Sequence, residues 1–255
     1  MDMVKKIGKL GISFVKAVSR FVVFFIVTVH NWFTGPYYLK VFFKNVLEIG
    51  FYSLPVVSLT ALFAGMVLAV QSYSGFSSFS AESAVATVVE IAITRELGPV
   101  FAGLMVAGRI GATMAASIGT MKVTEQIDAL KTLSVNPFKY IVSPRVLAGI
   151  VIMPVLVLVA DIIGVFGGFL VSVNNLGFNP YVYIKDTYNS VQSIDAVVGI
   201  VKGVVFGGII TSLGCYYGYY TEGGADGVGK ATTNAVVYSS ILILIFNYIL
   251  TDMFF

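Results

Sequence analysis

The chain has 255 residues, of which 57% are hydrophobic and 11% are charged, with a formal net charge of +3 and a mean hydropathy of +0.91. Soluble proteins are roughly 45–50% apolar and about 25% charged, so the composition indicates an integral membrane protein. The single histidine, His30, and the single cysteine, Cys215, leave an internal disulfide, a zinc site of several His or Cys and a Ser-His-Asp catalytic set without support.

The first 44 residues are expected to form a segment apart from the membrane bundle of residues 45–255. Its apolar residues recur at helical spacing with basic residues on the other faces, which predicts an amphipathic helix lying in the membrane surface. A sixth short span is the alternative, against which the charges of Lys16 and Arg20 argue. No small-residue cleavage site of a secretory signal follows Val29. The apolar positions are Ile7, Leu10, Phe14, Val18, Phe21 and Phe25.

Long segments without charge predict five transmembrane helices. No charge occurs over residues 49–81, 146–160, 203–221 or 231–251, and a span needs about 20 mainly apolar residues. Strands of an outer-membrane barrel would alternate apolar and polar residues, which these continuous runs do not. The expected fold class is therefore an all-α integral membrane protein. Its spans are predicted at residues 49–71, 87–114, 146–173, 196–220 and 231–252.

Lysine and arginine in the short loops predict the orientation of the spans. Residues 1–30 carry five of them and residues 119–145 carry four, whereas the loop 72–86 has none and contains Glu82. The N-terminus is therefore expected in the cytoplasm, and five spans place the C-terminus, residues 252–255, outside. The loop 174–195 is also expected outside, with a short interfacial helix because tyrosine favours the membrane boundary. The tyrosines are Tyr181, Tyr183 and Tyr188.

A polar island, residues 119–145, separates the second and third predicted spans. Its apolar residues recur at helical spacing, and Asn136-Pro137 is expected to end the helix. A cytoplasmic helix of this kind can lie on lipid. However, Glu125 and Asp128 make it nearly neutral, which favours a protein partner over an anionic membrane. The apolar positions are Val123, Ile127, Leu130 and Leu133.

Residues 224–231, Gly-Ala-Asp-Gly-Val-Gly-Lys-Ala, nearly fit the phosphate-binding loop of ATPases. Ala231 stands where that motif needs the magnesium-binding Ser or Thr, and no strand pattern precedes it. We therefore expect a glycine-rich turn with Lys230 at the cytoplasmic end of the last span. The isolated chain is expected to have no ATPase activity.

Several short motifs follow one another over about residues 45–250. They are Arg95-Glu96-Leu97-Gly98-Pro99, residues 107–112 (AGRIGA), residues 119–130 (GTMKVTEQIDAL), Pro144-Arg145 and residues 229–233 (GKATT). In this order and over this length they resemble the MlaE/YrbE family of lipid ABC transporter permeases.

The resemblance implies a homodimeric permease bound to two copies of a separate ABC ATPase, with a lipid-carrying MCE-domain protein on the outer side. It implies that phospholipid or a related lipid moves between the bacterial inner membrane and the periplasm. ATP and magnesium would be bound by the ATPase, and this chain would have no cofactor, metal, catalytic residue or nucleic-acid partner. Residues 119–133 would form the coupling helix seated in the ATPase, through Val123, Glu125, Ile127, Asp128 and Leu130.

Charged residues inside the predicted spans need a partner or water. Arg95 and Glu96 lie roughly 12–14 Å into the second span at 1.5 Å per residue, where an unpaired charge costs about 2.5–3.5 kcal/mol. With Leu97, they are the candidate lipid-binding residues, facing a lipid-filled cavity at the dimer interface where Arg95 attracts a phosphate. Structural pairing is the alternative. Asp161, Lys202 and Arg109 are candidates for either polar lining or structural pairs.

Three pairs of glycines are spaced as GxxxG, which favours close packing of spans. They are Gly164/Gly168, Gly203/Gly207 and Gly214/Gly218.

Two other functions stay open. A secondary transporter would place ionisable residues and broken helices in two related halves, and the sequence shows no such repeat. A membrane scaffold that transports nothing would leave the charges of Arg95 and Glu96 unexplained.

Overall fold

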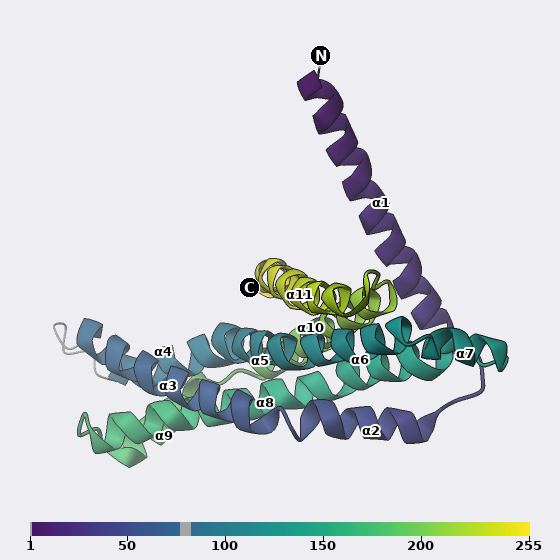
Figure 1. Ribbon diagram of the computed structural model, residues 1–255. Coiled ribbons are helices and arrows are strands. Elements are labelled where there is room, and N and C mark those ends of the chain that lie inside the picture. The colour runs from purple at the N-terminus through teal and green to yellow at the C-terminus, as the bar shows by residue number, and fades with distance from the viewer. Residues whose placement is uncertain (1, 77–82) are drawn as a thin grey trace.

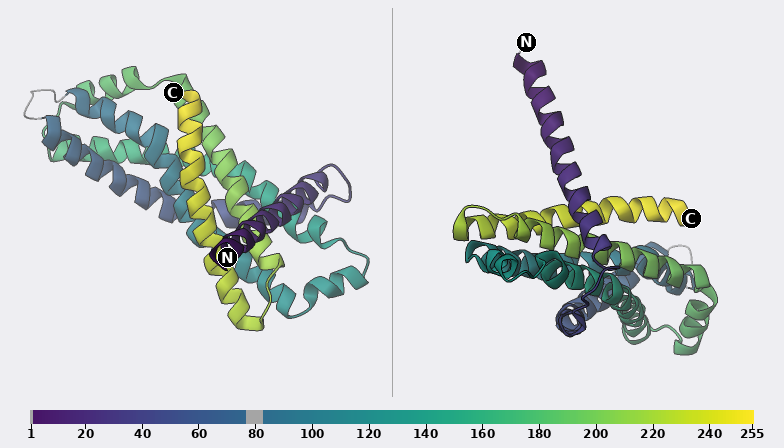
Figure 2. Two further views of the ribbon diagram at one scale, coloured as in Figure 1. Left: turned by 90° about the horizontal axis from the view of Figure 1, so that it is seen from above. Right: turned by 90° about the vertical axis from the view of Figure 1, so that its right-hand side faces the viewer.

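The computed structural model describes residues 2–76 and 83–255, and every regular element in them is a helix. Most helices run along one long direction and form an elongated bundle (Figure 1, Figure 2). The all-helical fold and the five spans predicted from the sequence are confirmed, and the chain is a multi-pass membrane protein. The stretches long and apolar enough to cross a membrane are Leu39–Phe76, Ala84–Val123, Phe138–Asn174, Ser193–Tyr219 and Gly224–Phe254.

The N-terminal segment is a single helix, α1 (Asp2–His30), which leaves the bundle at a steep angle to the spans (Figure 1). Its end packs on the bundle through Phe24, which is buried with its ring centroid 5.3 Å from that of Phe138 and 5.5 Å from that of Tyr216. The steep angle fits a helix that lies in the membrane surface. Of the predicted apolar face, the side chains of Ile7, Leu10 and Phe14 lie outside the described residues, as does Glu82 of the loop after the first span.

The first span consists of two helices, α2 (Leu39–Gly50) and α3 (Leu54–Phe76). The boundary predicted between residues 44 and 45 falls inside α2, which begins at Leu39. Arg109 from the second span donates to Ser53 Oγ (2.8 Å) in the break between α2 and α3.

The second span is one path of five elements: α4 (Ser83–Ala92), η2 (Ile93–Leu97), α5 (Gly98–Val106), η3 (Ala107–Gly111) and α6 (Ala112–Val123). η2 and η3 are π-helical turns, wider than an α-helix and frequent at functional sites. Each wide turn carries an arginine, Arg95 in η2 and Arg109 in η3. The charged motifs of the sequence therefore lie where the helix is locally widened.

The polar island holds a short helix, α7 (Gln126–Thr132), then the π-helical turn η4 (Phe138–Val142), which leads into α8 (Ser143–Asn174). The single helix expected over residues 119–133 is interrupted. α6 ends at Val123, and Glu125 has a positive φ of 60°, a left-handed conformation that a continuous right-handed helix does not contain. The regular spacing of apolar residues did not reveal this break.

The loop between the third and fourth spans forms the predicted short helix, α9 (Pro180–Ser190), which packs on α4. The helix begins where the Asn179 side chain accepts from the N–H of Tyr181 (2.9 Å). α10 (Ser193–Tyr219) and α11 (Gly224–Phe254) follow. Figure 2 shows α11 on one side of the bundle, and it packs on α10 and α6.

Glycines allow the spans to approach closely, as the GxxxG spacing predicted. A methyl group on Gly214 would lie 3.0 Å from Gly111 O, and one on Gly218 would lie 2.9 Å from Ala115 O. Gly164 meets Gly65 in the same way, so α8 touches α3 backbone to backbone. The spans around the second one are thereby held in fixed positions.

Candidate functional site

Polar side chains gather inside the membrane-spanning part, where η2 meets α10 and α11. We call this group the polar cluster. It is built from residues of the second, fourth and fifth spans, joined by hydrogen bonds and ion pairs: Arg95, Glu96, Asp195, Lys202, Asn247 and Thr251.

Glu96 is the acceptor at the centre of the polar cluster. Its carboxylate accepts from Asn247 Nδ2 (2.6 Å) and Thr251 Oγ1 (2.6 Å), and it pairs with Lys202 Nζ at 3.3 Å. The Lys202 side chain is fully buried, whereas that of Glu96 is 37% exposed. The ion pair thus offsets the cost of both charges and leaves one edge of Glu96 open.

Lys202 also completes the backbone of η2. In a regular helix the N–H of residue 99 would donate to the carbonyl of residue 95, but Pro99 has no N–H. Lys202 Nζ donates to Arg95 O instead, at 2.5 Å, and to Thr251 Oγ1 at 2.8 Å. Because Pro99 cannot donate to the Arg95 carbonyl, the buried ammonium of Lys202 donates to it instead.

Arg95 is held on one side only. Its Nε pairs with Asp195 Oδ1 at 2.8 Å, and its guanidinium lies 4.1 Å from the centre of the Phe255 ring. Asp195 is itself fixed, because its other oxygen accepts from the N–H of Gln192 (3.0 Å) at the start of α10. In the described part of the chain no hydrogen bond reaches the two Nη atoms of Arg95. Guanidinium N–H groups of this kind bind phosphate in bidentate fashion.

The other candidate residues lie outside the polar cluster. Leu97 is half-buried against an apolar cluster that includes Val89 and Ile93. Asp161 is buried in α8, with Oδ1 against Gly98. Arg109 is bound at the break in the first span, as described above. The structure thus brings together Arg95, Glu96 and Lys202 from the predicted set. In the described part of the chain, Leu97, Asp161 and Arg109 make no side-chain hydrogen bond or ion pair with them.

The family model described as Permease MlaE matches residues 42–253. A probable ABC transporter permease protein of Rickettsia felis is 55% identical over 255 residues, which cover all of this chain and 98% of that protein. The intermembrane phospholipid transport system permease protein MlaE of Haemophilus influenzae is 35% identical over 258 residues, again covering all of this chain and 98% of that protein. The chain belongs to the MlaE permease family.

A permease of this family is the membrane subunit of an ABC transporter, so ATP is hydrolysed by a partner ATPase and the MlaE-family chain is not itself catalytic. The glycine-rich turn expected at residues 224–231 is helical in the structure. Residues 224–231, which resemble a phosphate-binding loop, form the first turns of α11, and Lys230 pairs with Asp226 at 2.8 Å on the exposed surface.

Three members of the polar cluster were not predicted from the sequence. Asp195 was placed in the outer loop, but it lies in the first turn of α10, where it and Gln192 form a capping box. Asn247 and Thr251 are polar residues four apart in an otherwise apolar span, so they share one face of α11. The capping box and the four-residue spacing can both be read from the sequence. Neither shows which span Asp195, Asn247 and Thr251 contact.

The expected ATPase-contacting residues of this MlaE-family chain are not all accessible. Ile127 is fully buried in the chain's own core, because α7 folds back with this side chain inward. In this structure Ile127 therefore faces the chain's own core, and its contact with the ATPase stays a prediction. Leu130 is half-buried and Glu125 exposed. The large apolar side chains exposed here are Val123, at 41%, and Leu133, at 73%.

Asp128 fixes α7 to the end of the second span. Its carboxylate accepts from Lys131 Nζ (2.8 Å) within α7 and from Lys122 Nζ (3.0 Å) in α6. The hydrogen bond from Lys131, followed by that from Lys122, lowers the pKa of Asp128 below its ordinary value, and the same contact raises the pKa of Lys131. Asp128 therefore acts inside the chain, across the break at Glu125.

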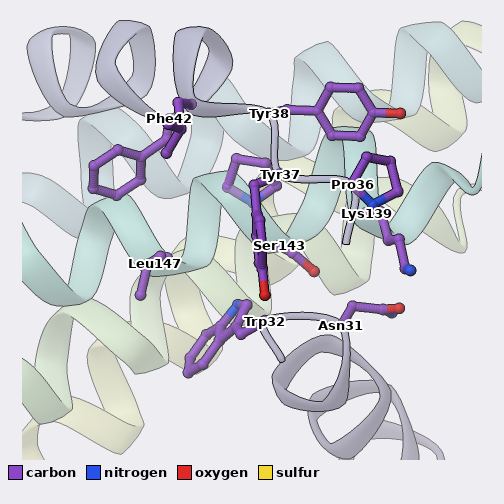
Figure 3. A pocket seen from close by; sticks show the side chains of 11 residues that line it. Asn31, Trp32, Pro36, Tyr37, Tyr38, Phe42, Lys139, Ser143 and Leu147 are labelled. Atoms are coloured by element: carbon purple, nitrogen blue, oxygen red, sulfur yellow. The ribbon is translucent and has the colours of Figure 1, made fainter. Parts of the chain in front are cut away.

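A cavity of about 140 Å³ lies where the loop after α1 meets α2 and the start of α8 (Figure 3). Figure 3 shows Trp32 and Leu147 among the side chains that line it. Lys139 Nζ donates to Gly35 O (2.7 Å) at this point. The N-terminal segment is thereby attached to η4, the turn that follows α7, near the expected ATPase contact.

Proposed function

We propose that this MlaE-family permease moves phospholipid or a related lipid between the bacterial inner membrane and the periplasm, driven by a separate ABC ATPase. The observation that carries the proposal is Arg95, a cation within the second span, level with the first turn of α10, whose two Nη atoms have no hydrogen-bond partner among the described residues. The relative from Haemophilus influenzae, whose name states intermembrane phospholipid transport, supports the same substrate class.

In this proposal Arg95 binds the lipid phosphate through its Nη atoms, while Asp195 and Phe255 hold the guanidinium in place. Glu96 lies beside it, with its carboxylate partly exposed and tied to both α10 and α11. A shift of either helix would change the position of η2. In the proposal, the polar cluster therefore couples lipid binding at Arg95 to movements of α10 and α11.

We also propose that the active form is a homodimer, with an MCE-domain protein at the outer side. α11 packs on α10 and α6 along one side, and its other side exposes large apolar residues such as Ile241, Leu244 and Tyr248. A second copy on this side would cover the open edge of Glu96 and enclose a lipid between the two chains. The distribution of lysine and arginine supports a cytoplasmic N-terminus and a periplasmic C-terminus.

The ATPase is proposed to bind the island around α7. Because Ile127 is buried, the contact is assigned to the exposed residues Val123, Glu125 and Leu133. The half-buried residues Leu130 and Asp128 form the rest of this surface. Leu133→Asp is expected to release the ATPase while the membrane part stays folded, because a charge cannot be buried in such an interface without a partner. Co-purification at normal stoichiometry would refute this contact. A permease that never binds an ATPase would favour the secondary transporter or the scaffold.

The test of the lipid contact uses the permease assembled with its ATPase in proteoliposomes. Arg95→Gln removes the cation and is expected to reduce ATP-dependent transfer of a fluorescent phospholipid at least about tenfold per assembled complex. Arg109→Gln is the matched control, an arginine in the same span outside the polar cluster. Equal losses in both variants, or full transport by Arg95→Gln, would contradict the assignment.

A further inference from the structure

A cavity of about 340 Å³ lies between α4, α8 and the region joining α9 to α10. Its lining is mainly apolar but includes three carboxylates, Glu90, Asp161 and Asp195, and we call it the acidic cavity. An apolar groove of about 460 Å³ between α8 and α9 adjoins it. The residues that line both spaces are Ile162, Val165, Thr187 and Val191.

Glu90 and Asp161 are buried in this lining without the donors that buried carboxylates need. Glu90 is fully buried and accepts from Thr94 Oγ1 (3.2 Å), but its Oε2 has no hydrogen-bond partner in the described part of the chain. The Ser190 hydroxyl, which is also near Glu90, donates to Thr187 O (2.8 Å). Asp161 is 7% exposed, and its Oδ1 also has no partner among the described residues. Such groups in a native structure call for an explanation.

The nearby cations are already engaged by other carboxylates. Arg95 pairs with Asp195 at 2.8 Å, and Lys202 pairs with Glu96 at 3.3 Å. This leaves Glu90 and Asp161 as two carboxyl groups next to the cavity with no cation paired to them among the described residues. A buried charge without a partner is unfavourable, so the fitting ligand brings a positive charge and N–H donors.

We propose that the acidic cavity and the adjoining groove bind a membrane lipid whose headgroup carries an ammonium group, of the phosphatidylethanolamine class. The ammonium lies between Glu90 and Asp161, and an acyl chain follows the groove lined by Ile162 and Val165. The carboxylates repel anionic headgroups, so phosphatidylglycerol is excluded. The inference deepens the proposed lipid function, on which it rests, by naming the headgroup that the permease binds in a cavity next to the polar cluster, with Asp195 shared between the two.

The first experiment places a photo-crosslinking amino acid at Ile162, which is 70% exposed and lines both spaces. The full chain with its ATPase is put into nanodiscs of equal phosphatidylethanolamine and phosphatidylglycerol, irradiated, and the captured lipid is identified by mass spectrometry. Phosphatidylethanolamine is expected in at least about fivefold excess. Equal capture of the two lipids, or capture of protein only, overturns the proposal, and this result requires no folding of a charge variant.

The second experiment removes the charges without changing the shape. Glu90→Gln and Asp161→Asn, separately and together, should bring the capture ratio toward one, whereas Asp226→Asn, an exposed carboxylate paired with Lys230, should leave it unchanged. A preference that survives in the double variant overturns the proposal. ATP-dependent lipid transfer is measured on the same wild-type preparation. Transfer without a headgroup preference at Ile162 refutes only this inference, whereas absence of transfer refutes the proposed function.

Discussion

Lys202 shows how single residues keep charge inside the membrane-spanning part of this permease. A lysine at the centre of a span costs about 2.5–3.5 kcal/mol when it is unpaired. Here the ammonium meets the carboxylate of Glu96, the hydroxyl of Thr251 and the carbonyl of Arg95 that Pro99 leaves without a donor. The Lys202 side chain therefore pairs with the charge of Glu96 and also supplies a hydrogen bond that the helix of the second span lacks.

Removing the charge of Lys202 should destabilise the protein more than removing both partners. Lys202→Met leaves Glu96 unpaired and is expected to lower the unfolding free energy by roughly 3 kcal/mol, the low end of the range for a broken buried pair, because the Glu96 side chain is 37% exposed. The double variant with Glu96→Gln should recover part of this loss. Thermal unfolding in detergent measures it, and simple additivity of the two substitutions would contradict the pairing.

Asp128 should respond to pH only in acid. Because its pKa is lowered, chiefly by the hydrogen bond from Lys131, its contribution to stability is complete above the ordinary carboxyl pKa of about 3.9 and is lost as the pH falls through the lowered value. Carboxyl carbon NMR should therefore show Asp128 ionised throughout pH 5–8, and Lys131→Met should raise its pKa. An unchanged titration in that variant would show that Lys131 does not bind Asp128.

The charged motif of residues 95–99 was recognisable from the sequence because charge is rare in a span, but its partners were not. Asp195 and Thr251 are distant in sequence from Arg95 and Glu96, and only the folded arrangement of the spans joins them. The burial of Ile127 was not foreseen for the same reason. Apolar spacing shows that a residue faces something apolar but does not show whether this is the chain's own core or a partner.

At the scale of elements, α8 and α10 pack so closely that there is no room for a side chain at Gly207. A methyl group at Gly207 would meet the carbonyl of Gly149 and lie 2.8 Å from Met153 Cβ. The next residue, Gly208, has only ordinary contacts, the nearest being Ile150 Cγ1 at 3.6 Å from the added methyl. A methyl side chain therefore fits at Gly208 but not at Gly207.

This difference can be measured. Gly207→Ala is expected to cost about 1–3 kcal/mol of stability, because the two backbones must move apart, whereas Gly208→Ala should be neutral or slightly stabilising, since alanine favours the helix. The comparison uses thermal unfolding of both variants in one detergent. Equal effects would show that α8 and α10 are not in contact at Gly207.

The position of α7 gives a second comparison between elements. Ile127→Ala creates a cavity in the core and is expected to cost about 2–5 kcal/mol, while Leu133→Ala, at a side chain 73% exposed, should stay within about 0.5 kcal/mol. Unfolding of the chain without its ATPase measures both. A larger loss for Leu133→Ala would mean that α7 presents the opposite face.

The spans were predictable because a long apolar run without charge has few alternatives to a membrane helix. The break at Glu125 and the π-helical turns were not, because each depends on contacts made elsewhere. Asp128 binds Lys122 across the break, and the wide turn η3 lets Arg109 reach Ser53 of the first span. Local periodicity therefore located the elements and missed their irregularities.

For the whole molecule, the second span connects the polar cluster with the island around α7. It carries η2, with the polar cluster, and continues through α5, η3 and α6 to the break before α7. Along this path it is held by α10 and α11, which also supply the partners of Glu96. A movement of the island produced by the ATPase can thus reach the polar cluster through one continuous element.

The most direct test of the central claim is lipid movement by the wild-type permease assembled with its ATPase in proteoliposomes. ATP should drive transfer of a labelled phospholipid, and neither the permease alone nor the complex with a non-hydrolysable ATP analogue should do so. A stable complex that hydrolyses ATP and moves no lipid in either direction would contradict the account.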